Sequence, residues 1–193
     1  MIMGITGGTG CGKTTLLSVI AQQGGLVIDC DALYHELLRT DTTLLQKIEN
    51  RFPGVVKNGI LDRKALGNLV FGDQNALQDL NAITHKAVYD AVLRILAAKP
   101  LLAAIDAIAL FESGLHRLCD MTIAVTAPTE DRIARIMARE QISCEYAEKR
   151  VLAQKSNEEF STLCDYTLNN DGTENDFRNK CLVFLKEQDI ITV

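Results

Sequence analysis

The feature that most constrains this chain is a glycine-rich run close to its start. Gly7 and Gly12 are separated by four residues and are followed directly by Lys13 and Thr14. This spacing fits the phosphate-binding loop pattern of Gly, four residues, Gly, Lys and Ser or Thr. Backbone N–H groups of such a loop turn inward and hold a phosphate group. The run therefore predicts a site for a nucleoside triphosphate, and the alternative is a glycine-rich turn with an exposed lysine.

The residues on either side place the run where this chemistry requires it. The apolar segment 1–5 predicts a buried strand, and apolar residues at helical spacing predict a helix over 14–24. The start of that helix would add its partial positive charge to the loop. We expect Lys13 to reach the β- and γ-phosphates and the Thr14 hydroxyl to bind Mg²⁺.

Composition limits the class of protein. With 193 residues the chain can form one sizeable core, and a net charge of −5 argues against wholesale binding of nucleic acid. The longest apolar stretch, 101–111, contains Asp106 and is too short to span a membrane. The six cysteines form no C-x-x-C pair, so we expect reduced thiols in a cytoplasmic protein. Cys11 lies inside the loop, where the helix start and Lys13 are expected to lower the pKa of its thiol and make it sensitive to oxidation.

Strand and helix patterns alternate along the chain. Further strands are predicted at 26–31, within 101–111, at 121–125 and at 166–168, and further helices at 31–50, 63–98, 129–139, 143–159 and 174–186. The alternation predicts an α/β fold in which helices flank a parallel sheet of five strands. We expect one kinase-like domain over 1–193, with its core at about 1–60, 100–131 and 160–193. A helical lobe at about 61–99 and a charge-rich lid at about 132–159 would complete it.

Carboxylates at the ends of predicted strands are candidates for chemistry. Asp31 ends the second strand, where it could accept a proton from an attacking hydroxyl, or could instead cap the next helix. Asp29 is the weaker candidate. Asp106 could be a second Mg²⁺ ligand, or could be a strand residue that faces a helix terminus.

Basic residues on the predicted helices have two readings. Arg132, Arg135 and Arg139 share one helix face, either as a solvated surface or to neutralise charge on a transferred phosphoryl group. We favour Arg139 as catalytic because it lies at the expected tip of the lid. His35 lies one helical turn after Asp31, and on spacing alone a structural role is the simpler reading for this histidine.

The chain resembles the dephospho-CoA kinases over most of its length. The resemblance rests on the phosphate loop with the residues before it, on 27–31, on 59–67, on 110–115, on Arg135 and Arg139, on 150–154, and on 165–170. It implies ATP-dependent phosphorylation of the ribose 3′-hydroxyl of dephospho-CoA, a small-molecule substrate, as the last step of coenzyme A synthesis. From the charge and the apolar segments we expect no nucleic-acid or membrane partner, and the oligomeric state stays open.

The resemblance also implies roles for individual residues. Asp31 resembles the general base, with Lys13 and Arg139 as the other catalytic groups. In the resemblance Arg63 and His85 would contact the acceptor. From their own places in the sequence, Asp31 and His35 are added as acceptor contacts, and Thr14 and Asp106 as candidate ligands of Mg²⁺. The residues implied to bind ATP are Gly8, Thr9, Gly10, Cys11, Gly12, Lys13, Thr14, Thr15, Asn169 and Asn170.

The chain departs from the family pattern at several positions, and two other functions remain open. Cys11 stands where the family usually has Ser, and Lys86 where it usually has Pro after the histidine. Neither change removes a group with a chemical role, although the lost proline leaves the geometry on the acceptor side undetermined. The alternatives are a kinase for another nucleoside or nucleotide acceptor and a non-catalytic regulator that binds ATP.

Overall fold

The computed structural model describes residues 1–191, which divide into two compact units. Unit 1 comprises Met1–Ile28, Pro100–Phe111 and the chain from Leu115 onwards. Unit 2 comprises Asp29–Lys99 together with Glu112–Gly114. Within residues 1–191 no helix combines the length and the apolar character needed to cross a bilayer.

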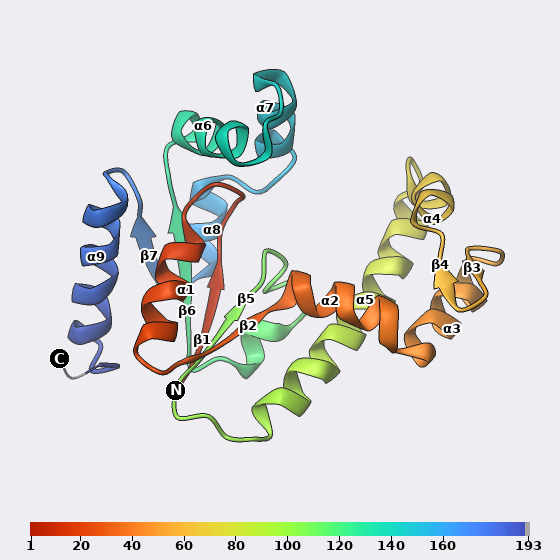
Figure 1. Cartoon of the computed structure of the whole chain (residues 1–193), viewed down its shortest axis with the longest axis horizontal. Coiled ribbons are helices and arrows are strands. Elements are labelled where there is room, and N and C mark those ends of the chain that lie inside the picture. Colours follow the sequence, from red (N-terminus) through yellow and green to blue (C-terminus); the bar gives the residue numbers. More distant parts are fainter. Residues whose placement is uncertain (192–193) are drawn as a thin grey trace. The chain divides into compact units, whose positions relative to one another are not determined.

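Unit 1 is built on a parallel sheet with the strand order β2-β5-β1-β6-β7 (Figure 1). Its strands are β1 (Ile2–Thr6), β2 (Leu26–Asp29), β5 (Ala103–Asp106), β6 (Met121–Thr126) and β7 (Tyr166–Asn169). The central strand β1 pairs in parallel with β5 and with β6, and β6 pairs in parallel with β7. The expected α/β fold with five strands is therefore confirmed for the described residues.

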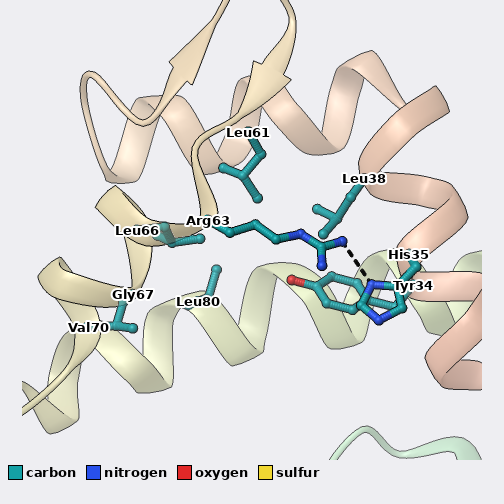
Figure 2. Close-up of a pocket in the computed structure, with 9 residues that line it drawn as sticks. All are labelled: Tyr34, His35, Leu38, Leu61, Arg63, Leu66, Gly67, Val70 and Leu80. Carbon is teal, nitrogen blue, oxygen red and sulfur yellow. Dashed lines mark hydrogen bonds between the residues drawn. The ribbon is translucent and has the colours of Figure 1, made fainter.

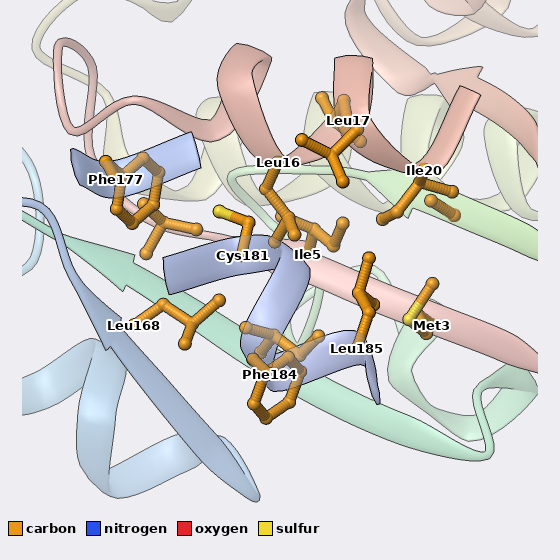
Figure 3. Packing of buried hydrophobic residues seen from close by; sticks show 14 of the residues in the cluster. Met3, Ile5, Leu16, Leu17, Ile20, Leu168, Phe177, Cys181, Phe184 and Leu185 are labelled. Carbon is orange, nitrogen blue, oxygen red and sulfur yellow. The ribbon is translucent and has the colours of Figure 1, made fainter. Parts of the chain in front are cut away.

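The main core lies between this sheet and the helices α1 (Lys13–Gln22) and α9 (Glu174–Glu187). Met3 and Ile5 of β1 are fully buried against both helices (Figure 3). Because side chains alternate along a strand, Gly4 faces the opposite side of the sheet. A Cβ atom on Gly4 would lie 2.8 Å from both Cys119 Sγ and a Leu110 methyl carbon, so the covering segment approaches the strand too closely for any side chain.

The remaining elements of unit 1 follow β5 and β6. The 3₁₀-helix η1 (Leu115–Leu118) packs against β1, and α8 (Asn157–Leu163) packs against β6. Helices α6 (Thr129–Glu140) and α7 (Cys144–Leu152) pack on each other through a small cluster of their own. Ile136, Ala147 and Val151 form its buried centre.

Unit 2 consists of helices packed on the long helix α5 (Gln74–Leu96). The others are α2 (Cys30–Thr40), α3 (Thr42–Arg51) and α4 (Arg63–Val70), and a hairpin of β3 (Val56–Lys57) and β4 (Ile60–Leu61) precedes α4. Each of the four helices starts behind an aspartate whose carboxylate accepts a backbone N–H of the first turn. These caps are Asp29, Asp41, Asp62 and Asp73.

Several expected elements are divided in the structure. The helix predicted over 31–50 is two helices, because Asp41 ends α2 and its carboxylate caps α3. The helix predicted over 63–98 is also two, because Gly72 takes a φ of 84° between α4 and α5. Likewise Ser156 caps α8 and breaks the pattern predicted over 143–159. The second strand ends at Asp29 rather than at residue 31, since the α2 helix begins at Cys30.

The second unit also begins earlier than the helical lobe expected at about 61–99. It starts at Asp29, because α2 and α3 pack on α5. The hairpin was not predicted, although Asn58 and Gly59, both with positive φ at its turn, are the residue pair that favours such a connection.

Candidate functional site

The phosphate loop has the backbone geometry of an anion cradle. Gly7, Gly10 and Gly12 have φ values of 137°, 81° and 102°, a region that side chains other than glycine rarely adopt. Gly12 is the residue before α1, and no side chain caps the first N–H groups of that helix. These N–H groups and the helix dipole are therefore available to a phosphate. Lys13 Nζ donates to Gly7 O at 2.9 Å, which holds the ammonium group over the loop.

Oxygen ligands suited to Mg²⁺ lie next to this loop. Thr14, in the first turn of α1, is exposed. Asp106 ends β5, in register with Ile5 of the neighbouring strand that leads into the loop. Mg²⁺ typically takes one or two protein oxygens and completes its shell with water and substrate phosphates. The residues fit such an ion, although the described residues contain no cluster of three or more His, Cys, Asp or Glu side chains that could hold a metal by themselves.

Two residues from the expected lid hold the tip of the loop. Arg132 of α6 is 2% exposed, and its Nε donates to Thr9 O at 3.0 Å. Gln154 donates from Nε2 to Thr9 Oγ1 at 2.7 Å and accepts the Thr9 N–H at 2.8 Å. Arg132 Nη2 donates to Gln154 Oε1 at 3.0 Å, which closes the network. We call Thr9, Arg132 and Gln154 the loop clamp; burial lowers the pKa of its arginine.

The other arginines of this region have different environments. Arg135 Nη1 donates to Gly10 O at 3.3 Å, so it also contacts the loop. Arg139, expected to be catalytic, is exposed and donates to Glu140 at 2.7 Å. Arg150 pairs with the same carboxylate, and both arginines hold the pKa of Glu140 below its ordinary value. In this structure the loop is therefore contacted by Arg132 and Arg135, while Arg139 is ion-paired at the end of α6.

Asn169 and Asn170 follow β7 and differ in what they contact. Asn170 is buried, and its Nδ2 donates to Cys11 O of the loop at 2.9 Å. A Cβ atom on Gly12 would lie 2.2 Å from that nitrogen, so glycine is required here by close approach as well as by φ. Asn169 donates to Asp171 at 2.8 Å.

Cys11 does not have the reactive environment expected from the sequence. Its side chain is 1% exposed, and burial raises the pKa of its thiol more than Lys13 lowers it. Desolvation of a thiolate outweighs the neighbouring charge and the helix start. The expectation of a low pKa was wrong.

The two aspartates at the start of unit 2 have separate roles. Asp29 is the helix cap, since its Oδ1 accepts the N–H of Ala32 at 2.9 Å. Asp31 lies in the first turn of α2 and is exposed. Among residues 1–191 its carboxylate has no hydrogen-bond or ion-pair partner. The capping alternative for Asp31 is therefore excluded, and this carboxylate remains available for chemistry.

His35 and Arg63, both expected to contact the acceptor, meet in one pocket of unit 2 (Figure 2). Arg63 Nη2 lies 3.0 Å from His35 Nδ1. Because arginine can only donate, His35 accepts through Nδ1 and carries its ring proton on Nε2. The pocket has a volume of about 230 Å³. It is lined by Tyr34, His35, Leu38, Leu61, Arg63, Leu66, Gly67, Val70 and Leu80.

His85 does not line this pocket. It lies in the middle of α5, is partly buried, and burial lowers the pKa of its imidazole.

Some residues of the site were not predicted from the sequence. The sequence left open whether Arg132 is a surface residue or a functional one, and it paired Gln154 only with Arg150. It gave no role to the pocket residues Tyr34 and Gly67. The spacing of Arg132 and Gln154 on their helices could not show that both reach Thr9.

Known proteins resemble this chain along most of its length. The model of the dephospho-CoA kinase (CoaE) family matches residues 1–176. A dephospho-CoA kinase of Latilactobacillus sakei is 37% identical over 176 residues, which cover 89% of this chain and 87% of the relative. One of Salinibacter ruber is 35% identical over 187 residues, which cover 92% of each chain.

Solved structures also resemble this chain in fold. A Thermus thermophilus protein matches with a TM-score of 0.80 and 34% identity over 97% of both chains. The dephospho-CoA kinase of Campylobacter jejuni matches with a TM-score of 0.68 and 28% identity, over 97% of this chain and 96% of that one. A shikimate kinase of Bacteroides thetaiotaomicron, at a TM-score of 0.61 and 11% identity, shares the fold.

Proposed function

This chain belongs to the dephospho-CoA kinase family, and on that premise we propose that it phosphorylates the ribose 3′-hydroxyl of dephospho-CoA with ATP, giving CoA and ADP. The observation that carries the proposal is the family match over residues 1–176. The uncapped, glycine-lined loop at the start of α1 supports it, because it is built to hold the phosphates of ATP. We expect the reaction in the cytoplasm, where thiols such as those of this chain stay reduced.

The loop residues would bind the phosphates of ATP mainly through backbone N–H groups. Lys13, already held over the loop by Gly7 O, would shift to the β- and γ-phosphate oxygens. Thr14 and Asp106 would hold Mg²⁺, which when bound neutralises charge on the phosphate oxygens. Asn170 holds the loop through its hydrogen bond to Cys11 O. We place the adenine of ATP near Asn169 and Asn170.

Asp31 would act as the general base toward the acceptor hydroxyl. Its carboxylate is exposed and unpaired among the described residues, and only Cys30 separates Asp31 from Asp29, the last residue of strand β2. A carboxylate within hydrogen-bond reach of a hydroxyl can take its proton as the oxygen attacks phosphorus. His35, Arg63 and His85 would hold the acceptor, in the role expected for the helical lobe.

Residues of the lid would complete the site. We propose that Arg139 leaves Glu140 when substrates are bound and neutralises charge on the transferred group, as arginines do in phosphoryl transfer. A lid that covers about 132–159 would also exclude water, which otherwise competes for the γ-phosphoryl group.

Product analysis tests the reaction directly. The purified protein is incubated with ATP, Mg²⁺ and dephospho-CoA, and CoA is sought by mass. Formation of CoA supports the proposal. Phosphorylation of other nucleosides but not of dephospho-CoA would show a kinase for another acceptor, and ATP binding with no transfer to any acceptor would show a regulator.

The base assignment is tested by two matched variants. Asp31→Asn removes the basic oxygen and is expected to reduce turnover by about 100-fold or more, while the affinity for ATP changes less than about twofold. Asp29→Asn makes the same chemical change two residues away, and asparagine caps a helix as well as aspartate does. It is expected to keep turnover near that of the wild type. Equal turnover for Asp31→Asn and the wild type would refute the role of Asp31.

A further inference from the structure

Helices α6 and α7 of the expected lid form a body with a small core of its own (Figure 1). Ile136 of α6 is fully buried in one cluster with Ala147 and Val151 of α7. Among the described residues, each of these two helices has its main packing partner in the other. We therefore expect them to move together, and the contacts at the two ends of this body decide how it is oriented on the rest of unit 1.

Both ends of this body are bonded to the same residue of the phosphate loop. Arg132 lies in the first turn of α6, and Gln154 follows directly after Ala153, the residue that ends α7. Between them they bind the N–H, the carbonyl oxygen and the hydroxyl of Thr9. A longer contact, from Arg135 Nη1 to Gly10 O at 3.3 Å, lies one turn further along α6. The two helices are thus held on the loop mainly through Thr9.

Gln154 is the group that joins the other two members of the loop clamp. Its Oε1 accepts the Thr9 N–H at 2.8 Å and Arg132 Nη2 at 3.0 Å. Its Nε2 donates to Thr9 Oγ1 at 2.7 Å. A side-chain amide both accepts and donates, so these partners fix which way it faces. Loss of Gln154 would free the end of α7 from the loop, while Arg132 would keep its bond to Thr9 O.

The far end of α6 depends on how firmly its start is held. Arg139 lies seven residues after Arg132, which places it about 10 Å further along the helix. A rotation of about 10° at the clamp would therefore move the end of the helix by about 2 Å. A misplacement of about 1 Å at a reacting group can slow a reaction about 100-fold.

We propose that Gln154 is a positioning residue for phosphoryl transfer: together with the Thr9 hydroxyl it fixes α6 and α7 on the phosphate loop, and so sets where Arg139 reaches the transferred group. This rests on the proposed function, in which Arg139 neutralises charge on that group. Gln154 acts through Thr9 and Arg132 and does not touch the substrate. The N–H groups at the start of α1, which would bind ATP, take no part in the clamp, so binding and transfer depend on different contacts.

Matched variants separate transfer from binding. Thr9→Val keeps the shape of the side chain without its hydroxyl, Thr9→Ser keeps the hydroxyl, and Gln154→Ala removes the amide. Lys149→Ala is the control, because it removes a side chain of α7 that is bonded to Glu145 and not to the loop. The kcat is measured with ATP and dephospho-CoA, and the affinity for a non-hydrolysable ATP analogue is measured by calorimetry.

Thr9→Val and Gln154→Ala are each expected to lower kcat about 10-fold or more, with a change in affinity for the analogue of less than about threefold. Thr9→Ser is expected to recover most of the kcat that Thr9→Val loses. Lys149→Ala is expected to stay near the wild type in both measurements.

A double-mutant cycle with Arg139→Ala tests whether the clamp acts through this arginine. Residual turnover is followed with radiolabelled ATP. Once Arg139 is truncated the clamp has no guanidinium left to place, so Gln154→Ala is expected to lower turnover less than about twofold further. A merely structural effect of Gln154 would instead lower turnover by the same factor in both backgrounds.

A distance measurement tests the clamp without the reaction. Cys144, at the start of α7, is exposed, whereas the other cysteines are buried or half-buried. Spin labels are placed on Cys144 and on Val183→Cys, an exposed position of α9, which packs on α1. We expect a narrow distribution of distances with the clamp intact and with Lys149→Ala, and a broad one with Gln154→Ala or Thr9→Val.

Other outcomes overturn the proposal. An unchanged distance distribution in Gln154→Ala would show that the clamp does not hold the two helices. Equal losses of turnover with and without Arg139, or a Thr9→Ser variant as slow as Thr9→Val, would show that Gln154 does not act through Arg139 or through the hydroxyl. If the wild type forms no CoA, the proposed function fails, and the distance distributions still decide whether the clamp fixes α6 and α7.

Discussion

Gly8→Ala tests whether the loop clamp, rather than the nucleotide, is what requires glycine at the second position of the phosphate loop. Gly8 has no positive φ, so its backbone accepts alanine. A Cβ atom there would lie 2.0 Å from Arg132 Nη2, 2.6 Å from its Cζ and 3.0 Å from Gln154 Oε1. Ordinary contacts begin at 3.4 Å, so the guanidinium would have to move by more than an ångström.

The cost follows from the bonds that hold the guanidinium. Its displacement breaks the Nη2 bond to Gln154 and strains the Nε bond to Thr9 O. A hydrogen bond to a charged group contributes about 1.5–3 kcal/mol, and part of it is regained from water. We expect Gly8→Ala to lower the free energy of unfolding by about 2–4 kcal/mol, which lowers Tm by roughly 4–16 °C for a chain of this size.

A double-mutant cycle in urea separates the two explanations. In an Arg132→Ala background the space is open, so Gly8→Ala is expected to cost less than about 0.5 kcal/mol. Gly67→Ala is the control in the same assay, since its added Cβ meets no protein atom and the helix gains propensity. If Gly8→Ala costs the same with and without Arg132, the steric reasoning is wrong. An ATP affinity that falls equally in both backgrounds would show that the phosphates require the glycine.

Three further predictions concern unit 2 and the thiols of Cys119 and Cys11. Asp29→Ala is expected to lower the free energy of unfolding by about 1 kcal/mol through the lost helix cap, whereas Asp31→Ala should stay within about 0.5 kcal/mol; equal losses in urea titrations would contradict the different roles of the two residues. Burial raises the pKa of the Cys119 thiol from 9.0 to about 12. The unfolded chain therefore releases this proton first, so stability is complete below pH 9.0 and falls as the pH rises towards about 12. Cys119→Ala should make that fall shallower, and an unchanged slope would exclude the thiol as its cause. Cys11 should react with a thiol reagent at neutral pH only as fast as the protein unfolds, and immediate reaction in the folded state would show that it is not buried.

Much of unit 1 could be predicted because its signals are local. The spacing of Gly7, Gly12, Lys13 and Thr14 describes a loop whose conformation depends on a few consecutive residues. Continuous apolar runs mark strands that are buried on both faces, and all of the predicted strands of the sheet are present. The helix breaks were harder to find, because Asp41 and Asp73 look like ordinary polar residues of a helix until their carboxylates are seen to cap the next one.

The candidate site could be predicted only in part. Asp31, His35 and Arg63 were expected near the acceptor, and the structure brings His35 and Arg63 into one pocket. The hydrogen bond from Ala32 N–H to Asp29 shows that Asp29, not Asp31, caps α2. No sequence pattern distinguishes the two aspartates in this respect. The pKa of Cys11 was predicted in the wrong direction, because the neighbouring charge is visible in the sequence and the burial is not.

The sequence by itself determined the phosphate loop, the parallel sheet that presents it and the family to which the chain belongs, since these depend on residue order over short spans. Only the tertiary structure decided that Arg132 and Gln154 hydrogen-bond to Thr9. It also decided that Arg63 and His35 share an aliphatic pocket with open space beside Gly67. Such contacts join residues that lie tens or more than a hundred positions apart. Their distance, burial and free space arise from how helices pack, and no spacing along the chain encodes them directly.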